Sequence, residues 1–264
     1  MTTPNVPYRI ELTFEMPGSP EQVWDAIATS HGITSWFLPT EVEERVGGAI
    51  TTHMGETDSP GTVTGWEPPR RFAYEEPEWA ALAGHAGADV TPLATEFLVE
   101  AQSGGTCVVR VVSSAFGTGA DWEQEFFDNM VGGWRPYFDR LRLYLAHYAG
   151  QTASPMAVEA NLAASAATVQ HQMRDAFGIG DPGTRVQIHE LTGVVERIGE
   201  EDMLVHVLGP VPGFLAFLTI ATGPDQTLAA VQGQFFAPDA DAFVEREAPR
   251  WRAWLEGLAV PVRS

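Results

Sequence analysis

The sequence of 264 residues contains no lysine, and all fifteen of its basic residues are arginine. The absence excludes a Schiff-base or pyridoxal-phosphate lysine. It also excludes a Walker A loop, whose lysine contacts the β- and γ-phosphates of a nucleotide. The 35 acidic residues give a formal net charge of −20. Because so acidic a surface repels phosphate groups, we expect neither nucleic acid nor a membrane as a partner.

Cysteine and long apolar runs are also scarce. Cys107 is the only cysteine, so neither an intramolecular disulfide nor a multi-cysteine zinc site can form. No two histidines have the spacing of a metal-binding helix, and we expect no metal and no cofactor. The N-terminal segment lacks the pattern of a signal peptide, and no run of 18 apolar residues occurs. We therefore expect a cytoplasmic protein.

Hydrophobic residues make up 44% of the chain, which is enough for a sizeable core. Residues 8–16 alternate between apolar and polar side chains, a pattern typical of a half-buried strand. Ser19, Pro20 and Gln22 then have the spacing of a helix start with a capping box. The remaining elements predicted for the first half are a helix over 31–36, strands over 40–46, 49–54, 61–66, 71–75, 93–101 and 107–113, a loose insertion over 76–90, and a long helix over 121–148.

The second half follows a predicted linker over 149–155 and repeats the order of helix, strands and terminal helix. Its predicted elements are a helix over 163–177, strands over 185–190, 193–198, 203–208, 214–222 and 227–236, and a helix over 239–258. A local sequence similarity supports the repeat, because GWRPYF at 133–138 is echoed by RWRAWL at 250–255. We interpret the second half as a diverged copy of the first.

Five stretches of the first half, taken in order, resemble the START-like (SRPBCC) superfamily, in the branch named for homologues of the activator of the heat-shock ATPase. They are SPEQVWDAIATSHGITSWF at 19–37, VGGAI at 46–50, GTVTGWEPPRRFAY at 61–74, GGTCVVRVV at 104–112 and GGWRPYFDRLRLYL at 132–145. The resemblance implies an α+β helix-grip fold, in which a curved antiparallel sheet wraps around a long C-terminal helix. It also implies a cavity between sheet and helix that commonly takes apolar ligands.

We therefore predict a helix-grip domain over residues 1–149 and a degenerate copy over 150–264. The candidate ligand-binding residues would face the helix-grip interior of the first domain, where each would belong either to a pocket wall or to a packed core. They are Trp36, Phe37, Trp66, Phe72, Tyr74, Phe97, Phe126, Met130, Trp134 and Tyr137. His53, with Glu56 and Asp58 close by, is a candidate base or polar anchor.

Three functions remain open at this point. The first is a module that binds a hydrophobic small molecule in the first domain, which holds six of the eight tryptophans. The second is a cyclase- or aromatase-type enzyme acting on a polyketide-like or other apolar substrate. The third is a chaperone-associated interaction protein. A buried carboxylate or histidine converging with tyrosine or arginine would favour the enzyme, whereas a large exposed apolar patch would favour the interaction protein.

Overall fold

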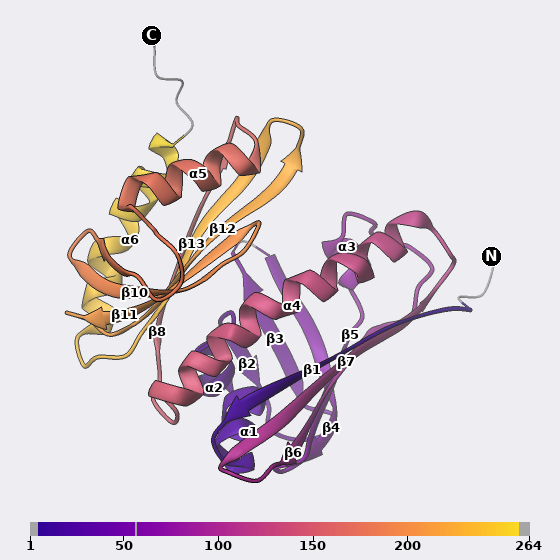
Figure 1. The fold of residues 1–264 in the computed structure, drawn as a ribbon. Helices are drawn as coiled ribbons and strands as arrows, with labels where there is room; N and C mark the ends of the chain where they lie inside the picture. Colours follow the sequence, from indigo (N-terminus) through magenta and orange to yellow (C-terminus); the bar gives the residue numbers. More distant parts are fainter. Residues whose placement is uncertain (1–4, 56, 259–264) are drawn as a thin grey trace. The chain divides into compact units, whose positions relative to one another are not determined.

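The computed structural model describes residues 5–55 and 57–258, which form two compact units. The first unit extends to Thr152 and the second begins at Ala153. Each unit contains one antiparallel sheet and a long helix at its C-terminal end (Figure 1). Across the described ranges, no helix has both the length and the apolar character that crossing a membrane requires.

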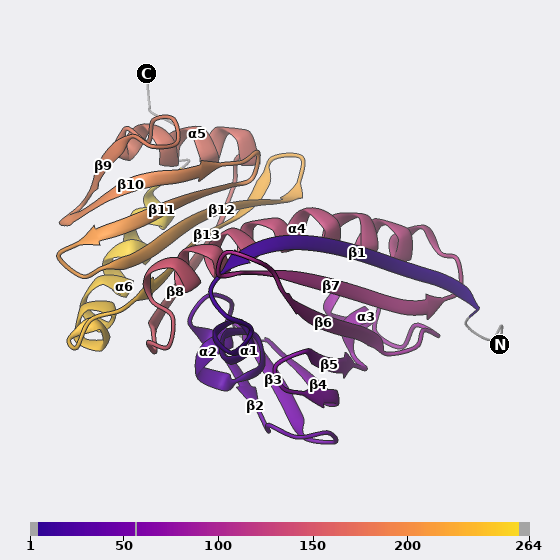
Figure 2. The ribbon, with the colours of Figure 1, turned by 60° about the horizontal axis from the view of Figure 1, so that its bottom comes forward.

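The first unit has the predicted helix-grip arrangement. Its elements are β1 (Val6–Pro17), α1 (Pro20–Ala28), α2 (Ser30–Thr34), β2 (Thr40–Val42), β3 (Ala49–Met54), β4 (Thr57–Glu67), β5 (Arg71–Glu76), α3 (Trp79–Leu82), β6 (Leu93–Ala101), β7 (Thr106–Gly117) and α4 (Asp121–His147). The sheet order is β1-β7-β6-β5-β4-β3-β2. The first strand therefore pairs with the last, and α4 lies along one face of the sheet (Figure 2).

Local sequence signals fix the ends of these elements. Ser19 accepts a hydrogen bond from the Gln22 amide, and the Gln22 side chain accepts one from the Ser19 amide. This capping box satisfies amide groups that the first turn of α1 would otherwise leave unpaired. Gly104 and Gly105 have positive φ angles of 88° and 79° at the turn between β6 and β7. Glycine adopts such angles without steric cost, so the predicted hairpin forms there.

The aromatic face of α4 packs on the sheet. Phe138 is fully buried and stacks on Phe14 of β1, with ring centroids 3.9 Å apart. Nearer the start of the helix, Phe127 stacks on Tyr8 at 5.2 Å. The first-turn residue Glu123 is also buried, and its carboxylate accepts hydrogen bonds from the backbone amides of residues 118–120. These contacts hold α4 against β1 and the loop that precedes the helix.

The second unit repeats this topology with one strand fewer. Its elements are β8 (Ser154–Leu162), α5 (Ala166–Phe177), β9 (Arg185–Ile188), β10 (Leu191–Ile198), β11 (Asp202–Gly209), β12 (Gly213–Gly223), β13 (Gln226–Phe235) and α6 (Ala240–Gly257). The sheet order, β8-β13-β12-β11-β10-β9, again pairs the first strand with the last. The matching strand order, with a helix after the first strand and another at the end, shows two tandem helix-grip copies.

Several element predictions need correction. The linker over 149–155 is too long, because β8 begins at Ser154 and extends through a stretch to which no element was assigned. The helix predicted from 163 starts at Ala166, where Ser165 is the N-cap. The strand over 40–46 ends at Val42. The helix predicted over 31–36 starts one residue earlier and ends two residues earlier, as α2. The insertion over 76–90 is less loose than predicted, because α3 forms within it.

Side chains of α6 are buried in the core of the second unit. Trp251 of α6, the counterpart of Trp134 in the sequence echo, is 1% exposed and lies 5.9 Å from Phe217 of β12, centroid to centroid. Leu255 of the same helix is fully buried, as are Met173 and Val231. The two copies therefore share a topology but differ in how the space between sheet and helix is used.

Candidate functional site

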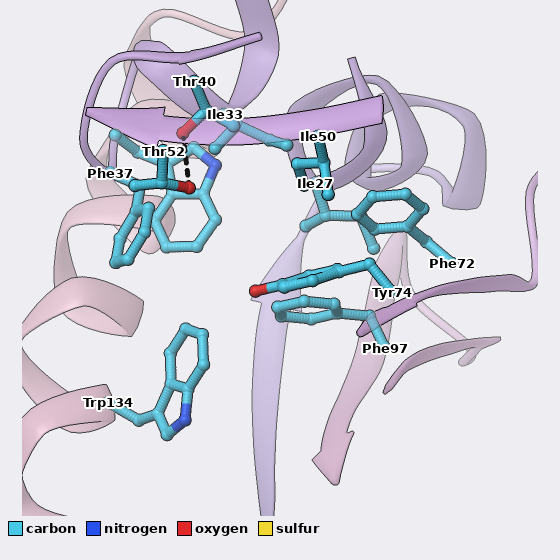
Figure 3. A pocket seen from close by; sticks show the side chains of 11 residues that line it. Ile27, Ile33, Phe37, Thr40, Ile50, Thr52, Phe72, Tyr74, Phe97 and Trp134 are labelled. Carbon is cyan, nitrogen blue, oxygen red and sulfur yellow. Dashed lines mark hydrogen bonds between the residues drawn. The ribbon is translucent and has the colours of Figure 1, made fainter. Parts of the chain in front are cut away.

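A small enclosed chamber lies between the sheet of the first unit, α1, α2 and α4 (Figure 3). Its volume is about 20 Å³, which is room for one water molecule or a methyl group. The lining residues are Ile27, Ile33, Trp36, Phe37, Thr40, Ile50, Thr52, Phe72, Tyr74, Phe97 and Trp134. The hydroxyl groups of Thr40 and Thr52 lie 3.3 Å apart and satisfy each other, so the chamber is largely apolar.

A larger cavity of about 640 Å³ adjoins the chamber and opens to solvent. Phe37, Thr52, Tyr74 and Trp134 line both spaces and form the wall between them. The other residues lining the larger cavity are Met54, Thr57, Asp58, Ser59, Glu76, Glu78, Trp79, Ala81, Leu82, Leu93, Thr95, Phe126 and Met130. The cavity thus extends from α4 across β3 to β6, and α3 of the insertion forms one side.

Most of the predicted aromatic residues lie on these walls. Trp36, Phe72 and Phe97 line the chamber, and Phe126 and Met130 line the larger cavity. Phe37, Tyr74 and Trp134 line both, with the rings of Phe37 and Trp134 stacked at 5.9 Å. Figure 3 shows the hydroxyl group of Tyr74 pointing into the space between the strands and Trp134.

Three predicted residues lie outside both linings. His53 follows Thr52 on β3, and side chains alternate between the two faces of a strand. His53 therefore lies on the face of β3 opposite to Thr52. Its Nδ1 is 2.7 Å from Oδ1 of Asp58. Trp66 packs edge-on against Trp24 of α1 at 5.0 Å. Tyr137 lies behind Phe37, and the Arg140 guanidinium covers its ring at 4.6 Å. Glu56, named beside His53, is outside the described residues.

The cavity also contains polar groups that the sequence did not single out. The Ser59 hydroxyl of β4 donates a hydrogen bond to Oε1 of Glu76, the last residue of β5. Thr95 of β6 lies beside them, and its hydroxyl is 3.2 Å from that of Ser113. Because Phe72, Tyr74 and Glu76 alternate along β5, strand periodicity would have placed Glu76 on the cavity face. It was missed because the strand was ended one residue too early.

Burial changes the acidity of both ionisable groups on β5. Burial raises the pKa of Glu76, and the hydrogen bond from Ser59 opposes this only in part. Burial also raises the pKa of Tyr74 well above its ordinary value, and the charge of Glu76 adds to the shift while the bond to Thr95 opposes it. The tyrosine is therefore a neutral hydrogen-bonding group at neutral pH, and the glutamate takes up a proton more readily than one in water.

The insertion forms a packed wall of the cavity. Trp79 of α3 is 2% exposed, and its indole Nε1 donates a hydrogen bond to the Thr91 carbonyl at 2.9 Å. Its ring lies 4.7 Å from that of Phe126 on α4, centroid to centroid. Leu82, at the end of α3, stays 38% exposed and lines the opening. The contact between Trp79 and Phe126 joins the insertion to the long helix.

The charged residues of the cavity lining are all acidic. Asp58, Glu76 and Glu78 belong to the lining, whereas none of the described lining residues is arginine or histidine. In the part of the chain that the structure describes, no three histidine, cysteine, aspartate or glutamate side chains come together as a metal site would need. The arrangement thus offers carboxyl and hydroxyl groups at one side of an otherwise aromatic cavity.

A sheet wrapped on a long C-terminal helix, with a cavity between the two, defines a START-like domain. A family model described as "Activator of Hsp90 ATPase homolog 1-like protein" matches residues 17–146. The match covers most of the first domain, and the resemblance predicted from the sequence is confirmed. No curated protein matches the chain.

Solved structures similar to the chain have low sequence identity. CalU16 from Micromonospora echinospora is 18% identical, with 52% of this chain and 73% of that chain covered and a TM-score of 0.41. The Aha1 dimer from Colwellia psychrerythraea is 17% identical over 54% of this chain and 99% of that one, with a TM-score of 0.43. The di-domain ARO/CYC BexL from the BE-7585A biosynthetic pathway is 14% identical over 94% and 95%, with a TM-score of 0.46. At these values none of them indicates what this chain does.

Proposed function

We propose that the first domain binds a hydrophobic small molecule in the cavity between its sheet and α4. The observation that carries the proposal is the open cavity of about 640 Å³ with aromatic walls. Pockets for small ligands have volumes of roughly 300–1,000 Å³ and mostly apolar linings with a few polar groups. Phe126, Met130 and Trp134 on α4 provide the apolar wall, and Tyr74 and Glu76 on β5 provide the polar groups.

A second candidate is an enzyme of the cyclase or aromatase type. The observation that favours it is the position of Glu76 and Tyr74, a carboxyl and a hydroxyl group on the same side of the cavity. Active sites often contain groups whose pKa is shifted by burial and by a charged neighbour, as it is for both of these residues. Incubation of the protein with a bound candidate substrate, followed by product analysis, tests this candidate. Conversion by the wild-type protein that is absent in the Glu76→Gln variant would identify the enzyme.

The third alternative, a chaperone-associated role, stays a prediction from the family resemblance. The large apolar side chains that are most exposed belong to different elements in both units. Among the described residues they are Val46, Met54, Leu82, Phe116, Val131, Leu208 and Ile220. Met54 and Leu82 line the cavity opening, so they also fit a ligand-binding function.

Titration with a neutral fluorescent probe, N-phenyl-naphthylamine, tests the proposed function. We expect one saturable site per chain. Met130→Trp should narrow the cavity beside α4 and weaken binding. Trp134→Ala should remove the wall between the cavity and the chamber and weaken binding roughly three- to tenfold.

Val131→Trp is the matched control for Met130→Trp, because Val131 is the next residue on α4, is 39% exposed and is not part of the lining. It should bind the probe like the wild-type protein. Saturable binding that Met130→Trp leaves unchanged would place the probe elsewhere and contradict the proposal.

A further inference from the structure

The charge of the cavity lining limits which classes of ligand can bind more strictly than the apolar walls of the cavity do. Asp58, Glu76 and Glu78 are part of the lining, and none of the described lining residues has a cationic side chain. The chain as a whole has a formal net charge of −20. A ligand with a carboxylate, sulfate or phosphate group would enter this site without a partner for its charge and against a repulsive potential.

Glu76 is the carboxyl group best placed to meet a ligand. Its Oε1 accepts the hydrogen bond from Ser59, whereas no described residue donates to Oε2. The side chain keeps part of its surface accessible although protein atoms surround it, and this surface belongs to the cavity lining. A buried carboxyl group with one unpaired oxygen is costly to ionise, and a cationic partner would remove that cost.

Aromatic rings surround the same space. Trp79 of α3, Phe126 and Trp134 of α4, and Tyr74 of β5 all line the cavity with Glu76. The faces of such rings carry negative electrostatic potential and attract ammonium groups, most strongly in the case of tryptophan. Aromatic walls together with a carboxyl group therefore suit an organic cation better than they suit a neutral hydrocarbon.

We propose that the cavity takes ligands that join an aromatic or apolar body to a protonated amine, and that Glu76 pairs with the ammonium group. The proposal rests on the proposed function, since it concerns the ligand of the same cavity. The proposed function leaves the charge of the ligand open, whereas here the ligand is a cation and Glu76 is the residue that recognises the charge.

Binding of an ammonium group should depend on the proton of Glu76. The ionised carboxylate binds the cation and the protonated form does not, so affinity for an amine should fall as the pH is lowered through the raised pKa of Glu76. The other ionisable groups around Glu76 are Asp58 of β4, which is bonded to His53, Tyr74 of β5, and Glu78 at the start of α3. From α4 and β6, only uncharged side chains line the cavity.

Three probes with the same ring system separate charge from apolar burial: naphthylmethylamine, naphthalenemethanol and naphthoate, measured by calorimetric titration of the full chain. The amine should bind roughly ten- to a hundredfold more tightly than the alcohol at neutral pH, the range expected for a hydrogen bond to a buried charge. The anion should bind most weakly. In Glu76→Gln the amine should lose its advantage while affinity for the alcohol stays within about twofold.

Glu75→Gln is the matched control, because it removes the same charge from the neighbouring residue, which is exposed and outside the lining. It should keep the preference for the amine. Equal affinity for amine and alcohol would overturn the amine proposal but leave the proposed function intact. The amine proposal would also be overturned if Glu76→Gln did not reduce the preference for the amine, or if Glu75→Gln reduced that preference equally. If none of the three probes binds, the proposed function fails as well.

Discussion

Glu76 is a carboxyl group that is largely surrounded by protein and also lines the cavity. Its burial raises its pKa above the ordinary value. Its single described hydrogen bond, from Ser59, offsets only part of the cost of ionisation. Such a group stabilises the folded protein less when charged than when protonated, so Glu76 couples the stability of the first domain to pH.

Glu76→Gln should therefore stabilise the protein at neutral pH by about 0.5–1 kcal/mol. The folded-state pKa lies above the ordinary value of 4.5. Below that value the group is protonated in both the folded and the unfolded chain, and the ionisation cost is absent. The difference between variant and wild type should thus appear only as the pH rises through the folded-state pKa. Urea unfolding between acid and neutral pH measures it, with Glu75→Gln as the control for loss of a neighbouring negative charge.

For single residues, the aromatic walls were predicted from the sequence and the polar groups of the cavity were not. Apolar residues such as Phe97 and Trp134 follow strand or helix periodicity, which fixes the face on which they lie. The sequence does not show how a strand end or a neighbouring ring directs a side chain. For that reason Tyr137 was placed in the cavity. The other two errors had simpler causes, because the alternation of side chains along β3 was not applied to His53 and because β5 was ended one residue before Glu76.

Among the elements, the insertion between β5 and β6 and the strand β8 depart most from the prediction. The stretch with Trp79 contains many small residues, and the packing of Trp79 against Trp122, Phe126 and Phe127 of α4 turns it into a wall. In β8 the buried residues Met156, Val158 and Leu162 alternate with exposed ones, so the strand period was present. It was overlooked because alanine and asparagine between them weaken the contrast, and because a linker was expected there.

The helix α4 contains a glycine pair at Gly132 and Gly133, one turn before Pro136. Neither glycine has a positive φ angle, and a Cβ atom added at either would meet nothing within 4 Å. Gly133→Ala should therefore stabilise the first domain by about 0.5–1 kcal/mol through the higher helix propensity of alanine. Thermal unfolding checks this. An unchanged or lower melting temperature would mean that α4 needs glycine at this position.

At the scale of the whole molecule, the chain consists of two copies of one topology that use their interiors differently. The first unit keeps an open cavity between sheet and helix, whereas Trp251 and Leu255 of α6 are buried in the core of the second. The repeated order of elements was predictable from the sequence. The difference in packing depends on how individual side chains fill the space, which periodicity does not reveal.

A fragment that ends at Thr152 should keep the probe site if it folds, because every residue that lines the cavity belongs to the first unit. A fragment that starts at Ala153 should not bind the probe with comparable affinity. Circular dichroism confirms folding, and titration with N-phenyl-naphthylamine measures binding. Binding by the folded second fragment alone would reverse the assignment of the two domains.

Photoaffinity labelling tests most directly whether the cavity of the first domain is the ligand site. A neutral aromatic diazirine, bound to the full chain and activated by light, can be located by peptide mass spectrometry. We predict saturable labelling of peptides from β5, α3 and α4, reduced in Met130→Trp and kept in Val131→Trp. Labelling confined to residues 153–264, or labelling that Met130→Trp leaves unchanged, would contradict the account.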